Sequence, residues 1–192
     1  ALRDTVRAAV TIAKYIAADD CAGLADPERL ATTVPDLDLY HPWRFTLDEA
    51  IERARACEQA ARDVDSRIRN SEGATLSSYE GLDVYGNTHG FIGATATTRH
   101  SLSCAVIGQD ASGMQRDYWY TLARAAGDLE TPEQVGRESA RRSLRRLGGR
   151  KLATRRTPVL YEAPVASSLL SHFVSAIRGS SLYRQASFLL DH

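Results

Sequence analysis

The sequence predicts an α+β fold, with helices packed on a mainly antiparallel sheet, and three observations carry this prediction. The 192 residues are 43% hydrophobic and 25% charged, the composition of a soluble globular chain rather than a disordered or collagen-like one. Apolar residues recur every three or four positions before residue 70 and again after residue 131, the spacing of amphipathic helices. Between these regions, residues 74–123 are rich in Thr, Ser, Tyr, Val and Ile and contain Gly- or Asp-bearing turns, as hairpin-connected strands do.

The first part of the chain, 1–70, is expected to be helical. A first helix over 1–18 has an apolar stripe made by Leu2, Val6, Ala9, Ala13 and Ile16. A second helix opens with a capping box between Thr46 and Glu49 and keeps a helical period to about residue 68. Both are rich in alanine, so we expect them to pack closely on each other or on the sheet. The connector 26–43 is expected to be ordered, because its Leu37, Leu39, Tyr40 and Trp43 would pack on a neighbouring surface.

The second part, 71–163, is expected to hold the sheet and one helix. Five strands are predicted, at 74–79, 82–85, 90–97, 101–107 and 115–123. Small residues dominate 90–105, so another segment should approach one face of the sheet closely. A helix over 132–147 follows, with Thr131 as N-cap and Gln134 closing a capping box. A further strand is predicted near 158–162.

The third part, 164–192, begins with a helix over 165–178 that Pro164 opens and Gly179 closes. The chain starts inside a helical pattern and its only methionine is Met114, so we expect a piece of a longer protein. It shows no secretory leader and no run of 18 apolar residues that could span a membrane. The three cysteines Cys21, Cys57 and Cys104 are odd in number and far apart, which favours a reducing compartment.

Residues 137–156 carry nine basic side chains against one acidic side chain, Glu138, which alone would suggest phosphate binding. However, the formal net charge of the whole chain is zero, and no aromatic residue interleaves these arginines as a base-stacking surface would require. The spacing around Gly148, Gly149 and Lys151 is not that of a phosphate-binding loop. We therefore favour a solvated or partner-facing helix over a nucleic-acid site. Its exposed side is expected to hold Arg141, Arg142, Arg145 and Arg146.

Candidate nucleophiles and metal ligands are few. Cys104 lies in an apolar strand and is expected in the core, and His100 would stand about 13 Å away at ~3.3 Å per residue, too far to activate it. Asp36, Asp38 and His41 could form a loose metal cluster, although their spacing matches no known site. His172 lies on the helix over 165–178, which offers no second ligand one turn away, so we expect a structural role for it.

Three stretches resemble one family. They are Asp36-Leu-Asp-Leu-Tyr-His-Pro-Trp43, Glu80-Gly-Leu-Asp-Val-Tyr-Gly-Asn-Thr-His-Gly-Phe91, and the region from Pro158 to Leu190. In this order they are similar to the TldD/PmbA family, specifically its PmbA (TldE) branch. The resemblance implies that the chain is a fragment of the N-terminal and middle part of a longer α/β and β-rich protein. It also implies that residues 164–192 lead into a missing C-terminal domain.

The family resemblance implies a function as well. TldD and TldE form a heterodimeric, cytoplasmic zinc protease of unfolded peptides, connected with microcin maturation, gyrase modulation and antitoxin degradation. The zinc helix of TldD carries His-Glu-x-x-x-His, whereas the similar helix here has His172, Phe173 and Ile177 at those positions. We therefore expect no catalytic residue, metal or cofactor in this chain, and zinc in a TldD-like partner.

Three hypotheses stay open at this stage. The chain is a non-catalytic partner subunit, a metallopeptidase in its own right, or a gyrase- or DNA-associated regulatory module. Expected partners are the TldD-like subunit and unfolded peptides, with a homodimer when the chain is alone, no membrane contact and no nucleic acid.

Overall fold

The computed structural model describes residues 1–19 and 22–190. It divides into two compact units, Ala1–Gly149 and Arg150–His192, which are described separately. The first unit combines α-helices with a three-stranded antiparallel sheet, and the α+β class expected from the sequence is confirmed. No helix in the described part of the chain has both the length and the apolar character that crossing a bilayer requires.

The first helices of the first unit are shorter than predicted. Helix α1 covers Leu2–Ala13 and none of its residues is buried, so the expected close packing of this helix is not found. A short 3-10 helix, η1, follows at Pro27–Arg29. Helix α2 covers Leu47–Arg62 and begins with the predicted capping box, in which the Thr46 N–H donates to Glu49 Oε2 at 2.7 Å. The chain then enters a strand at Ile68, a residue that the helical period had included.

The sheet consists of three long strands where five shorter ones were predicted. They are β1 (Ile68–Gly86), β2 (Ile92–Asp110) and β3 (Gly113–Ala123), in the order β1-β2-β3 with antiparallel pairing throughout. The predicted breaks near residues 80–81 and 98–100 are absent because these residues face one another in register: Glu80 pairs with Thr98 and Gly81 with Thr97. The Tyr79 side chain lies over Gly81, where a Cβ atom would stand 2.4 Å from its hydroxyl and displace the ring.

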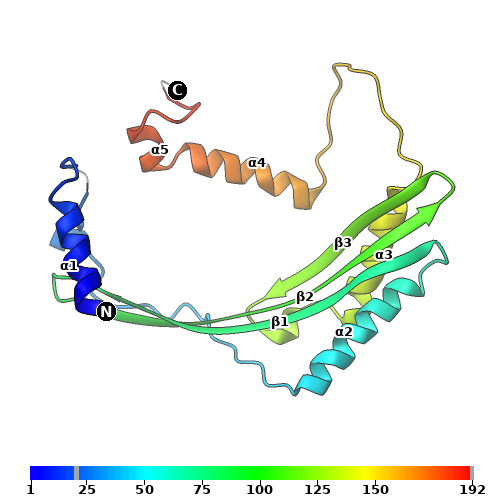
Figure 1. Cartoon of the computed structure of the whole chain (residues 1–192), viewed down its shortest axis with the longest axis horizontal. Coiled ribbons are helices and arrows are strands. Elements are labelled where there is room, and N and C mark those ends of the chain that lie inside the picture. The colour runs from blue at the N-terminus through cyan, green and yellow to red at the C-terminus, as the bar shows by residue number, and fades with distance from the viewer. Residues whose placement is uncertain (20–21, 191–192) are drawn as a thin grey trace. The chain divides into compact units, whose positions relative to one another are not determined.

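Two helices cover one face of this sheet (Figure 1). After the 3-10 helix η2 (Ala126–Asp128), helix α3 covers Pro132–Arg145 and lies beside α2. The two backbones approach closely at Gly136, where a Cβ atom would lie 2.1 Å from the carbonyl oxygen of Cys57. The buried apolar core between the helices and the sheet is formed by Cys57, Ala61, Ile68, Leu102, Cys104, Val106, Val135 and Ala140.

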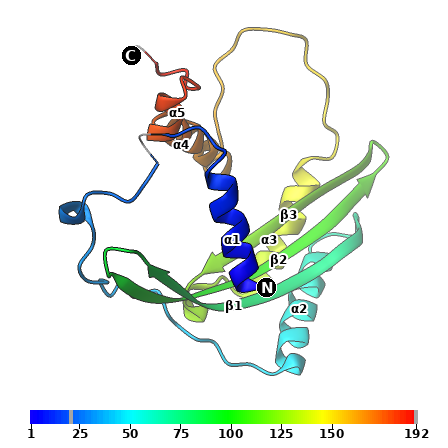
Figure 2. The ribbon, with the colours of Figure 1, turned by 60° about the vertical axis from the view of Figure 1, so that its left-hand side comes forward.

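Strands β1 and β2 extend beyond the third strand (Figure 2). Strand β3 ends at Ala123, opposite His100, and the remaining residues 79–86 and 92–99 form a two-stranded ribbon. The connector before α2 packs on this ribbon, as the sequence predicts for Leu39 and Trp43: Thr98 N–H donates to the Leu39 carbonyl at 2.9 Å, and the Trp43 ring lies 5.4 Å from that of His100. Leu37, by contrast, remains 61% exposed.

The second unit is helical. Helix α4 covers Ala163–Ala176, and helix α5, which the sequence analysis missed, covers Gly179–Tyr183. The strand predicted at 158–162 is wrong, because none of the described residues pairs with this extended segment. Ala176 is the one buried residue of α4, and its Val165, Leu169 and Phe173 are about half exposed.

Candidate functional site

His172 lies on α4 and is solvent-exposed. Phe173 follows it, and Ile177 stands at the C-terminal cap of the helix. In the described part of the chain, no three His, Cys, Asp or Glu residues come together in a way that could hold a metal ion. A catalytic zinc needs about three protein ligands. The residues around His172 therefore do not fit a zinc site.

Asp36, Asp38 and His41 do come together, but as a local turn. Asp38 N–H donates to Asp36 Oδ1 at 2.9 Å, and Asp38 has a positive φ of 52°. His41 Nε2 lies 2.9 Å from the Asp38 carbonyl oxygen and 3.4 Å from its carboxylate. The Asp38 side chain is 89% exposed. These contacts shape the chain between residues 36 and 41 and leave both carboxylates at the surface.

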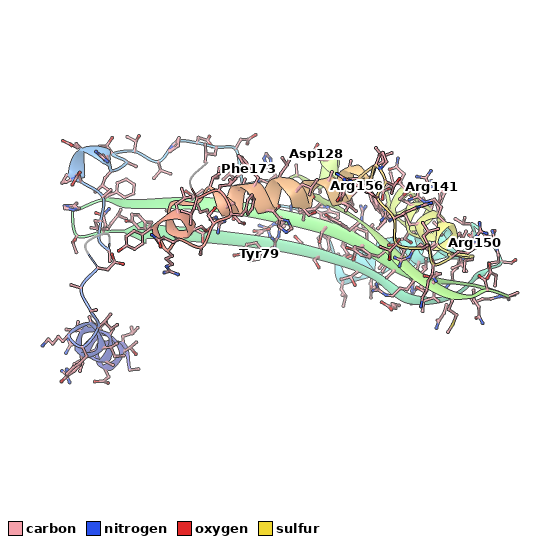
Figure 3. The ribbon with its side chains drawn as sticks, turned by 90° about the horizontal axis from the view of Figure 1, so that it is seen from above. Tyr79, Asp128, Arg141, Arg150, Arg156 and Phe173 are labelled. Atoms are coloured by element: carbon pink, nitrogen blue, oxygen red, sulfur yellow. The ribbon has the colours of Figure 1, made fainter. Side chains whose placement is uncertain are left out.

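The arginines of α3 are not all on the exposed side of the helix. Arg142 was expected on the exposed side of the helix, and this prediction is wrong. Its side chain is 15% exposed, lies 3.7 Å from the Asp117 carboxylate, and stacks over the Trp119 ring at 5.2 Å. Arg146 also approaches Asp117, at 3.6 Å. Arg141, labelled in Figure 3, is largely exposed and pairs with Glu138. Several of these positive charges are therefore engaged by acidic or aromatic side chains of the same unit.

Two cysteines meet in the core. Cys57 of α2 and Cys104 of β2 are 0% and 1% exposed, and the burial expected for Cys104 is confirmed. The adjoining Cys104 thiol and burial together raise the pKa of the Cys57 thiol. Cys57, as a buried and protonated thiol, is therefore a poor nucleophile. Cys21 lies outside the described residues.

The sequence analysis missed a buried polar cluster centred on His100. This side chain is 0% exposed, and its Nε2 lies 2.9 Å from the His41 carbonyl oxygen. Because a carbonyl only accepts, Nε2 carries a proton, and in the neutral ring Nδ1 accepts from the Ser78 hydroxyl at 2.9 Å. The cluster joins β1, β2 and the connector before α2. No local pattern in the sequence indicates this cluster, because the pairing of Ser78 with His100 is known only from the strand register.

Residues 34–41, which we call the wrapping segment, run around the free edge of β2. At one end, Thr98 N–H donates to the Leu39 carbonyl at 2.9 Å and His41 N–H donates to Thr98 Oγ1 at 2.9 Å. At the other end, Val34 lies on Gly93, where a Cβ atom would be 2.5 Å from Val34 Cγ2. Between these two contacts the segment leaves a cavity of about 420 Å³ beside Ala94, Thr95 and Ala96. This is the close approach that the small residues of 90–105 predict.

The opposite face of the sheet carries aromatic side chains along its borders. Tyr79 of β1 is 55% exposed and is labelled in Figure 3. Tyr118 and Tyr120 of β3 stack with ring centroids 6.3 Å apart and are about half exposed. Small polar residues of β2, Ser101 and Ser103, lie between these borders. Neither α2 nor α3 covers this face.

These features define a class: an α+β unit with an antiparallel sheet, two helices on one face, and no assembled metal-ligand group among the described residues. A solved structure from Thermotoga maritima, named as a modulator of a DNA gyrase, has this fold, with a TM-score of 0.70 and 21% sequence identity. The alignment covers 84% of this chain and 36% of that one.

The family follows from the sequence comparisons. Residues 40–147 match the PmbA/TldA metallopeptidase central domain, and the chain therefore belongs to the PmbA/TldD family. It is 51% identical over 191 residues to the "Metalloprotease PmbA" of Escherichia coli O157:H7 and 46% identical over 192 residues to a PmbA homologue of Haemophilus influenzae. All of this chain is covered in both comparisons, but only 42% and 43% of the relatives.

Proposed function

We propose that this chain is part of the non-catalytic subunit of a cytoplasmic, two-subunit zinc metalloprotease that cleaves unfolded peptides. In this proposal a TldD-like partner holds the zinc and performs hydrolysis. The chain contributes scaffold and peptide-facing surface to the PmbA-type subunit. The names of the relatives support a connection with proteolysis.

One observation carries the non-catalytic role. Helix α4 is the segment that resembles the zinc helix of the family, and it presents His172 without the glutamate and the second histidine that hydrolysis would need. A general base beside the metal-bound water is required to activate it, and Phe173 has no ionisable group. A peptidase activity of this subunit by itself is the alternative that the name "metalloprotease" suggests.

A DNA-binding role is less well supported. Arg142 is held by Asp117 and Trp119, and Arg146 also approaches Asp117. These contacts reduce the positive charge that α3 could offer to phosphate groups. We expect no submicromolar binding in a gel shift near physiological salt, and binding that Arg141→Glu abolishes would favour the gyrase-associated role instead.

Reconstitution tests the proposal. The full-length protein is assayed on an unfolded peptide alone, then with its TldD-like partner. We expect hydrolysis only by the pair, and we expect His172→Ala in this subunit to leave that activity largely intact. His89→Ala, at an exposed hairpin tip, is the matched control. Hydrolysis by the full-length protein alone, lost on His172→Ala, would overturn the proposal.

A further inference from the structure

The edge of β2 between Gly93 and Thr98 is open. Strand β3 pairs with β2 only as far as His100. Two residues earlier on the same edge, Thr98 N–H donates to the Leu39 carbonyl. In an antiparallel strand, the N–H and C=O groups of alternate residues point to the same side. The N–H and C=O groups of Ala94 and Ala96 therefore point outward, away from β1, as the N–H group of Thr98 does.

These outward peptide groups lack partners. In the parts of the chain that the structure covers, 1–19 and 22–190, no hydrogen bond joins Ala94 or Ala96 to any segment on this side. An unpaired strand edge is a template for another strand, which would lie about 4.8 Å away. The wrapping segment does not fill this position. It bonds to the ribbon at Thr98, its Tyr40 hydroxyl donates to Glu80 Oε2 at 3.3 Å, and its Val34 lies on Gly93. Between the Thr98 and Gly93 contacts it leaves the cavity of about 420 Å³.

The residues that line the cavity favour a positively charged ligand. Its outer wall includes Asp36 and Asp38, and its inner wall is the strand edge from Ala94 to Ala96. None of the described residues that line it is basic. His41, which follows the wall, has its Nε2 directed at the Asp38 carbonyl oxygen at 2.9 Å. A ligand with positive side chains would therefore find two carboxylates at the surface beside the cavity and no basic residue in its lining.

We propose that this slot binds an extended, basic peptide, which adds a short strand to the edge of β2 between that edge and the wrapping segment. The backbone of the peptide would pair with the N–H and C=O groups of Ala94 and Ala96, and a lysine or arginine would lie against Asp36 and Asp38. Addition of a strand to a sheet edge is a common mode of peptide recognition, in which the backbone gives affinity and the side chains give specificity.

The small residues of this region fit that role. Ala94, Ala96 and Gly93 keep the edge free of bulky side chains, so a second backbone can approach it closely. The inference deepens the proposed function and rests on it for the source of the peptides. Peptide binding tests the slot and peptide cleavage tests the proposed function, so the failure of one can be distinguished from the failure of the other.

The experiment measures peptide binding to the full-length protein by fluorescence anisotropy at low salt. The probe is a fluorescein-labelled six-residue peptide of alternating lysine and valine, compared with a version in which glutamate replaces lysine. Ala96→Pro removes the outward N–H at a position where an edge strand tolerates proline. Asp36→Asn combined with Asp38→Asn removes the charge and keeps the oxygen that accepts from Asp38 N–H. Asp83→Asn, an acidic position on the same ribbon outside this cavity, is the control.

We expect the lysine peptide to bind at least tenfold more tightly than the glutamate peptide. Ala96→Pro should weaken binding at least tenfold, and the double asparagine variant should weaken it about fivefold and reduce its salt dependence. Asp83→Asn should bind as the unaltered protein does. If Ala96→Pro fails to fold, the change in peptide binding of the double asparagine variant tests the inference instead.

Absence of binding, equal binding of both peptides, or unchanged binding in the double asparagine variant would overturn the inference. An equal loss in Asp83→Asn would overturn it as well. In each of these cases, hydrolysis by the reconstituted pair would leave the proposed function in place.

Discussion

Helices α3 and α4 have the same length, 14 residues, and both have proline near their first position, yet they differ in how they are packed. Helix α3 buries Val135, Gly136, Ser139, Ala140 and Ser143 against α2 and the sheet. Helix α4 buries only Ala176, although it is the more apolar of the two. The difference shows that apolar composition alone does not bury a helix: α3 packs on α2 and the sheet, where its Gly136 allows close contact.

The largest effect is expected at the contact between α2 and α3. Gly136→Ala would place a Cβ atom 2.1 Å from the Cys57 carbonyl oxygen, where backbone must move to make room. We expect the free energy of unfolding to fall by about 3 kcal/mol, the upper range for overpacking. Urea unfolding of the 192-residue chain measures it.

The control for this substitution is Gly127→Ala. A Cβ atom at Gly127 meets nothing within 4 Å, so its stability should stay within about 0.5 kcal/mol of the original. Equal stability of the two variants would contradict the close contact at Gly136.

Matched valines compare the two helices directly. Val135 of α3 is 0% exposed and Val174 of α4 is 49% exposed. Val135→Ala should lower the free energy of unfolding by about 2 kcal/mol, because it leaves a cavity in the core. Val174→Ala should cost less than about 1 kcal/mol in the same chain. Similar losses in a pair of thermal unfolding curves would show that α4 is packed as α3 is.

A smaller effect is expected at the arginines of α3. Arg142→Ala removes a side chain that stacks on Trp119 and approaches Asp117, and should cost about 1 kcal/mol. Arg141→Ala removes an exposed pair with Glu138 and should cost less than about 0.5 kcal/mol. The two variants are compared by urea unfolding at low and high salt. A larger loss for Arg141→Ala would contradict the assignment of Arg142 to the interior side of the helix.

Local signals in the sequence were reliable where the partners lie close together in the chain. Both capping boxes were predicted and are present, with Thr131 N–H donating to Gln134 Oε1 at 2.8 Å in the second. The core position of Cys104 also followed from its apolar strand.

Features that depend on strand register could not be predicted in this way. His100 meets Ser78, 22 residues away, and the His41 carbonyl, 59 residues away, and neither contact has a local pattern. The strand pattern divides β1 near Gly81 and β2 after Thr97, whereas the cross-strand pairing of Glu80 with Thr98 and of Gly81 with Thr97 keeps the ladder intact. The position of Arg142 depended on Asp117 and Trp119, which β3 supplies.

The most direct test of the non-catalytic role is the zinc content of the purified full-length protein after exposure to zinc and removal of the excess. Our account predicts much less than one zinc per chain, with no change on His172→Ala, because His172 has neither a neighbouring glutamate nor a second histidine on α4. About one zinc per chain, lost in the His172→Ala variant, would contradict the account and support a metallopeptidase.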